Sequence, residues 1–101
     1  MGLTIALQDE SGNRIKEVYD PTNILHKLLP SYDDRTYQCL RFIDWYGDTV
    51  FNYLQMESFL TEWNRIREAE KSHEERELLS QIEDLARRVQ NERLYLKFIG
   101  D

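Results

Sequence analysis

Residues 40–56 read LRFIDWYGDTVFNYLQM, and this stretch decides the fold that we expect from the chain. It is the most aromatic part of the sequence, and aromatic and β-branched side chains favour strands because they pack well on a pleated surface. The turn sequence YGD at 46–48 separates an apolar run at 40–44 from a second run at 49–54. The pattern therefore predicts a central β-hairpin on which the segments before and after it pack.

Periodicity alone also allows a helical interpretation of parts of this stretch. Leu40, Phe42 and Ile43 fit one face of a helical turn as well as a strand, and a helix that begins near Thr49 fits the residues that follow. We favour two strands because the turn at Gly47 separates two runs of strand-like composition.

The residues before the central stretch predict a second hairpin and a short helix. Residues 3–8 alternate as a half-buried strand does, residues 9–13 are rich in turn formers, and residues 14–19 return as a strand. Asp20 and Pro21 suit the N-cap and the first position of a short helix. The apolar stripe of this helix consists of Ile24, Leu25, Leu28 and Leu29.

The residues after the central stretch predict two helices and a final strand. The period becomes helical at 57–70 and again at 72–90, and a capping box of Ser72 and Glu75 favours two helices over one continuous helix. Residues 94–99 alternate with apolar side chains on both faces, as expected for a central strand that is covered on two sides. The clearest helical stripe consists of Leu78, Leu79, Ile82, Leu85, Ala86 and Val89.

Together these segments predict a single α+β domain that spans residues 1–101. We expect a small antiparallel or mixed sheet built from the N-terminal hairpin, the central hairpin and the C-terminal strand. The two C-terminal helices are expected to cover one face of this sheet. A length of 101 residues suits one domain with one modest core.

The composition is that of an acidic globular protein. Apolar residues make up 41% of the chain and charged residues 32%, which argues against disorder. The formal net charge of −6 repels phosphate backbones, so we expect no nucleic-acid binding, and it favours encounter with a basic protein. The alternative is that the charge only keeps a small protein soluble.

The sequence also indicates a cellular location. No apolar run reaches the roughly 20 residues that a membrane helix needs. The residues after Met1 do not form a signal peptide. Cys39 is the single cysteine, which excludes an internal disulfide and suits a reducing compartment. We therefore expect a cytoplasmic protein that does not associate with membranes.

Few residues point to catalysis or to metal binding. His26 and His73 lack a partner at metal-ligand spacing, and no motif places Cys39 beside either of them. We therefore expect no catalytic residue, no metal and no cofactor. The acids near the central hairpin, Asp44 and Asp48 above all, leave one enzymatic alternative, a small-ligand or metal-dependent hydrolase.

The turn of the central hairpin is the binding site that we predict. Asp44, Trp45, Tyr46 and Asp48 bring aromatic rings and carboxylates together where packing has no obvious need for them. Large exposed aromatic side chains are enriched among interface anchors. The alternatives are that one ring covers the core and that the carboxylates cap the turn.

Two segments of the sequence resemble known proteins. The segments RFIDWYGDTVFN at 41–52 and YLKFIGD at 95–101 resemble parts of small uncharacterised bacterial single-domain proteins. In size, acidity and α+β pattern the chain is also similar to immunity proteins of bacterial toxin systems. This similarity implies a protein partner, and it assigns a role to no residue of this sequence.

These observations predict a non-enzymatic protein-interaction module, and the charge favours a basic protein as its partner. The hydrolase described above is one alternative. A self-associating structural module, such as a homodimer, is the other.

Overall fold

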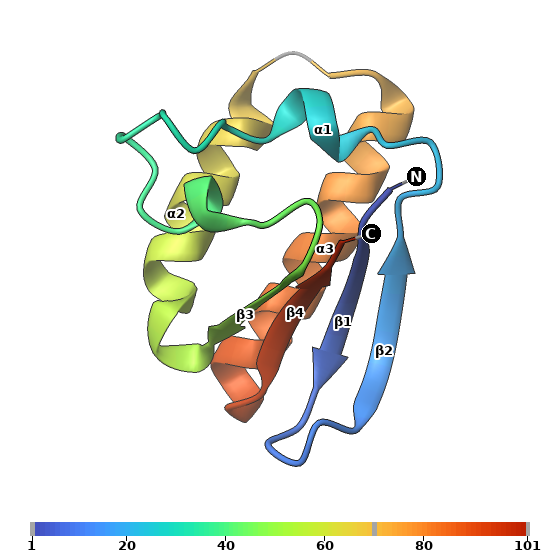
Figure 1. Ribbon diagram of the computed structural model, residues 1–101, viewed down its shortest axis with the longest axis vertical. Coiled ribbons are helices and arrows are strands. Elements are labelled where there is room, and N and C mark those ends of the chain that lie inside the picture. Colours follow the sequence, from blue (N-terminus) through green and yellow to red (C-terminus); the bar gives the residue numbers. More distant parts are fainter. Residues whose placement is uncertain (1, 70, 101) are drawn as a thin grey trace.

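A computed structural model of the chain describes residues 2–69 and 71–100, and its four strands form one antiparallel sheet in the order β2-β1-β4-β3 (Figure 1). Helices α2 and α3 pack on one face of this sheet, so the predicted α+β fold is confirmed. The strands are β1 (Thr4–Gln8), β2 (Arg14–Tyr19), β3 (Asp48–Asn52) and β4 (Tyr95–Ile99). The helices are α1 (Leu25–Leu28), α2 (Met56–Glu68) and α3 (His73–Glu92), and two 3-10 helices are η1 (Leu40–Phe42) and η2 (Tyr53–Gln55).

The N-terminal hairpin forms as the sequence predicts. Strands β1 and β2 pair in antiparallel register with Ile5 opposite Val18. The carboxylate of Asp9 accepts the backbone N–H groups of Ser11 and Asn13, which closes the connecting turn. Gly12 sits in this turn with a φ of 85°, a conformation that suits glycine because it has no Cβ.

The central hairpin is not formed, and this part of the prediction is wrong. Residues 40–44 are not a strand, because Leu40–Phe42 is the 3-10 helix η1. The second run does form a strand, β3, which pairs with β4 instead. A helix that begins near Thr49 is not found either, because α2 starts only at Met56, after η2.

A buried carboxylate on α2 explains the shape of residues 38–42. Glu62 is 6% exposed, and it accepts the backbone N–H groups of Gln38 at 2.6 Å, Cys39 at 3.1 Å and Leu40 at 3.0 Å. A side chain that accepts successive N–H groups at the start of a helical turn replaces the partners that a strand would provide. Glu62 lies at least 22 residues after the N–H groups that it accepts, so no local sequence pattern includes both partners.

Two separate C-terminal helices are confirmed. Ser72 caps α3 by accepting the N–H of Glu75, whose carboxylate accepts the N–H of Ser72 in return. The predicted helix end at Glu70 lies outside the described residues, and α2 ends at Glu68. The terminal residues Met1 and Asp101 of the predicted domain are likewise not described. The predicted stripe of α3 is fully in the core.

The short helix is smaller than expected, and Pro21 is not its first residue. The helix α1 spans only Leu25–Leu28. Asp20 is buried and does cap the chain, because its carboxylate accepts the N–H groups of Ile24 and Leu25, each at 2.8 Å. The residues between Asp20 and α1 form a turn in which Asn23 has a φ of 59°.

The sheet is covered on one side only. The alternate residues Leu96 and Phe98 of β4 are fully buried beneath the helices, as predicted. Tyr95, Lys97 and Ile99 point to the opposite side and are only half-buried. The expectation that this central strand is covered on both faces is therefore wrong, and Figure 1 shows both long helices behind the sheet.

Among the described residues, no helix combines the length and apolar character needed to cross a membrane.

We predict that Ile82→Asp unfolds the protein. Ile82 has no exposed surface and lies in the middle of the apolar stripe of α3, so the variant would bury a charge that has no partner. Circular dichroism melting should show no cooperative transition. The matched control is Gln90→Asp on the exposed side of the same helix, which should melt as the wild type does. A wild-type melting temperature for Ile82→Asp would contradict the assigned core.

We also predict that Glu62→Gln lowers the free energy of unfolding by about 2 kcal/mol or more. The amide keeps only one acceptor oxygen and turns an NH₂ donor toward backbone N–H groups, so charged hydrogen bonds are lost in a buried place. For a domain of this size the melting temperature should fall by roughly 10 °C. Glu57→Gln, an exposed substitution on the same helix, is the control. Equal melting temperatures for the two variants would show that the Glu62 carboxylate does not hold residues 38–40.

Candidate functional site

The two aromatic residues of the predicted binding turn have different roles. Trp45 is partly buried against the core, and its ring meets the His26 ring edge-on with 5.0 Å between the ring centres. Tyr46 is 85% exposed. Gly100 packs against the backbone of this turn so closely that an added Cβ would collide with the Trp45 carbonyl. The turn is therefore fixed in place by Trp45 and presents Tyr46 to solvent.

The two carboxylates of the turn have local partners. Asp44 accepts the backbone N–H of Tyr46 at 2.9 Å, and its own N–H donates to the Thr49 hydroxyl at 2.9 Å. Asp48 forms an ion pair with Lys97 of the neighbouring strand at 3.3 Å. The predicted site residues thus lie together at the start of β3, and each acid stabilises the turn or the sheet. Within residues 2–69 and 71–100, no three His, Cys, Asp or Glu side chains are grouped as ligands for a metal ion.

Cys39 and the two histidines form no catalytic group at this turn, and only His26 packs against it. Cys39 is buried, and burial together with the nearby Glu62 carboxylate raises the pKa of its thiol to about 11. A thiol with this pKa is protonated at neutral pH and is therefore a poor nucleophile. His73 lies on the first turn of α3 with its ring 3.4 Å from the Glu77 carboxylate, and His26 packs on Trp45.

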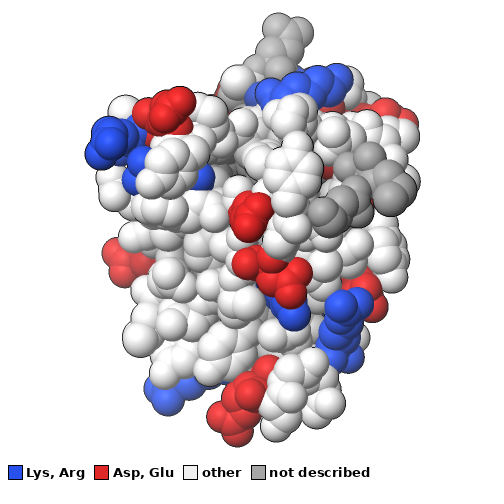
Figure 2. All heavy atoms as spheres, viewed as in Figure 1, with Lys and Arg blue, Asp and Glu red and all other residues white. Residues whose placement is uncertain are grey.

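The uncovered side of the sheet, which we call the outer face, is a surface feature that the sequence did not predict. It consists of alternate residues of all four strands, in rows that the strand register defines. Tyr19 and Val50 are 62% and 47% exposed on it. Figure 2, which views this side, shows a surface that is mostly uncharged, with acidic groups and adjoining basic groups near its middle. One row is Tyr19, Thr4, Ile99 and Asp48, and the next is Glu17, Ala6, Lys97 and Val50.

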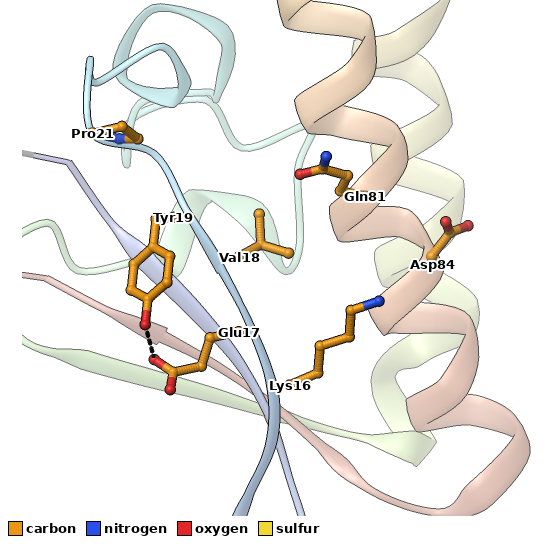
Figure 3. Close-up of a pocket in the computed structure, with 7 residues that line it drawn as sticks. All are labelled: Lys16, Glu17, Val18, Tyr19, Pro21, Gln81 and Asp84. Atoms are coloured by element: carbon orange, nitrogen blue, oxygen red, sulfur yellow. Dashed lines mark hydrogen bonds between the residues drawn. The ribbon is translucent and has the colours of Figure 1, made fainter.

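A groove runs along the free edge of β2, between this strand and α3. Its larger part has a volume of about 500 Å³, and a neighbouring part of about 230 Å³ continues it toward the start of α3. Figure 3 shows Lys16 and Val18 pointing from β2 toward α3, whereas Glu17 and Tyr19 lie on the other side of the strand. The larger part is lined by Lys16, Glu17, Val18, Tyr19, Pro21, Gln81 and Asp84.

The groove as a whole has no signal in any local window of the sequence, because its two walls are far apart in the chain. Residues 16–21 come from the first hairpin and Gln81 and Asp84 from α3, and no local pattern states which strand of a sheet is left at the edge. One signal was present in β2 itself. Residues 14–19 contain Lys16 and Glu17 beside Val18 and Tyr19, and such a mixture of charged and apolar residues is typical of an edge strand.

Comparison with known proteins adds no assignment to this geometry. No protein-family model matches the sequence, and no curated protein or solved structure matches it either.

We predict that the two neighbouring aromatic residues respond differently to truncation. Trp45→Ala should lower the free energy of unfolding by about 1–3 kcal/mol, because the ring packs on the core and on His26. Tyr46→Ala should change it by no more than about 0.5 kcal/mol, since the exposed ring makes no buried contact. Urea unfolding curves of the two variants measure both values. A larger loss for Tyr46→Ala than for Trp45→Ala would reverse the assigned roles.

Proposed function

We propose that this chain is a non-enzymatic protein-interaction module that binds a basic protein through the outer face of its sheet. The observation that supports this proposal is the one-sided cover of the sheet, with both long helices on the opposite side. A sheet face that carries exposed apolar and aromatic side chains is a common place for another protein to bind. An immunity protein of a bacterial toxin system, the class that the size, acidity and α+β pattern of the chain suggest, would act in the same way, by binding a protein.

The exposed side chains of the outer face suit a protein interface. Tyr19 supplies a large ring with a polar end at one edge of the sheet, and Val50 supplies aliphatic surface at the other edge. Tyrosine is enriched among the residues that dominate binding energies, because it buries much area at little cost in side-chain entropy. Tyr46, two residues before Asp48, is a further exposed ring next to the start of β3.

Charge selects the kind of partner. The two acids of the outer face, Glu17 and Asp48, are each paired with a base, Arg14 at 3.1 Å and Lys97 at 3.3 Å. These pairs leave the local face almost balanced, so the preference comes from the whole molecule and its net charge of −6. The electrostatic field of this negative net charge accelerates encounter with a basic protein and repels a second copy of the same chain.

The experiment is a pull-down from the native host at low and at moderate salt, with the purified chain as bait. We expect one stoichiometric partner of basic pI, bound more weakly at the higher salt. Val50→Glu should abolish its capture, because it places a charge in the middle of the β3 edge of the outer face. Gln90→Glu, which adds the same charge on the far side of α3, should retain it.

Three results would contradict the proposal. The first is the absence of any stoichiometric partner at both salt concentrations. The second is equal capture by Val50→Glu and the wild type. The third is a stable homodimer in light scattering that Val50→Glu dissociates, which would assign the outer face to self-association instead.

A further inference from the structure

We infer that the free edge of β2 binds an extended, lysine- or arginine-containing segment of a partner protein, which adds to the sheet as a fifth strand beside α3. This inference rests on the proposed function, for which it names the form and the chemistry of the bound segment. It is carried by the unpaired backbone of β2, by the groove between β2 and α3, and by the acidic wall of that groove.

The register of β2 shows which of its backbone groups face outward. The N–H of Asp20 donates to the carbonyl of Leu3, and in an antiparallel pair alternate residues share this orientation. Val18 and Lys16, which lie opposite Ile5 and Leu7, therefore bond to β1. Glu17 and Tyr19 alternate with these residues along β2, and their backbone N–H and C=O groups point away from the sheet. Among the described residues, no cap, turn or side chain takes these outward groups.

The groove gives an added strand a second contact surface. Side chains of such a strand alternate, so half of them would enter the groove against α3 and the other half would extend the outer face beside Tyr19. The combined groove reaches along β2 from Lys16 to Asp20 and Pro21. At about 3.3 Å per residue, a bound segment of roughly five or six residues matches this length. Addition to a sheet edge in this manner is a common form of peptide recognition.

The wall of the groove favours basic side chains. Glu74, Glu77 and Asp84 of α3 line it at helical spacing, on the side that faces β2. Lys16 is the one base among the residues that line the two parts of the groove. A lysine or arginine of the bound strand can therefore meet a carboxylate of α3 at more than one register. A second copy of this chain is a poorer occupant, since pairing through β2 would bring two acidic α3 walls together.

The opposite edge of the sheet also carries outward backbone groups. The N–H of Gly100 donates to the carbonyl of Gly47, so Asp48, Val50 and Asn52 of β3 have their backbone groups outward. The N–H of Asn52, however, already donates to the Gln55 side chain at 2.8 Å. Strand β3 then runs directly into η2 and α2. Asp48 and Val50 keep outward N–H groups, as Glu17 and Tyr19 of β2 do, so what distinguishes β2 is the groove beside it.

The test uses two synthetic peptides of eight residues that alternate Val or Thr with Lys in one peptide and with Glu in the other. Fluorescence anisotropy should show the Lys peptide binding at least about tenfold more tightly than the Glu peptide. Two-dimensional NMR should show slower hydrogen exchange at the amides of Glu17 and Tyr19 when the Lys peptide is bound, because these N–H groups gain acceptors.

Substitutions separate the backbone contribution from the charge contribution. Tyr19→Pro removes an outward N–H and keeps the inward bonds of β2, so it should abolish peptide binding, whereas Tyr19→Ala, which keeps the N–H, should bind detectably. Asp84→Asn combined with Glu77→Gln should weaken the Lys peptide about tenfold and leave the Glu peptide unchanged or tighter. Glu57→Gln on α2 is the charge control. Circular dichroism melting verifies that each variant is folded.

Several outcomes would overturn the inference. These are equal affinity for the two peptides, exchange protection at Val50 instead of Tyr19, and equal binding by the folded Pro and Ala variants. Failure of the proposed function has a different signature. A host partner that is lost with Val50→Glu but captured equally by folded Tyr19→Pro and Tyr19→Ala supports the outer face as a binding surface and rejects the β2 edge. Selective binding of the Lys peptide without capture of any host partner supports the β2 edge as a binding site and contradicts the proposed function.

Discussion

The carboxylate of Glu62 is the interaction on which the middle of the structure depends. It accepts N–H groups from three consecutive residues, Gln38 to Leu40, and so joins a long connection to α2. Arg65, one turn further along the helix, donates to the Thr36 carbonyl and lies over the Tyr37 ring at 4.1 Å. With this connection held on α2, the chain leaves η1 in the direction that allows β3 to reach β4. The cost of burying a charge is offset because the carboxylate is saturated with donors.

This interaction also explains which parts of the fold could be predicted from the sequence. Strands β1 and β2 and helix α3 carry their signals locally, as alternation, turn residues and a capping box, and they form where expected. Residues 40–44 have the composition of a strand, but their shape is decided by Glu62, which no local window includes. Composition likewise placed Trp45 and Tyr46 in one site without separating them, because only the packing of His26 shows which ring is covered.

The open side of the sheet results from the way that the helices are connected. The links from η2 to α2 and from α2 to α3 are short, and both helices lie on the same face of the sheet, where α3 packs on β1, β2 and β4. On the other side, Ala6 is fully buried although no helix lies above it. Its strand neighbours are Glu17 and Lys97, whose long side chains cover such a small residue. The outer face is therefore partly self-covered at its centre and most exposed toward its edges, where Tyr19 and Val50 lie.

The strand order has a consequence for the synthesis of this chain. The two central strands, β1 and β4, lie at opposite ends of the described sequence, and β3 has β4 as its strand partner. While residues 95–99 are still inside the ribosome, the first hairpin and β3 have no strand to join them. Pairings between such distant segments close slowly, because a long loop must be ordered before any contact compensates. The four-stranded sheet is therefore completed only after the synthesis of β4, and until then the edges of β1 and β3 that pair with β4 remain open to other proteins.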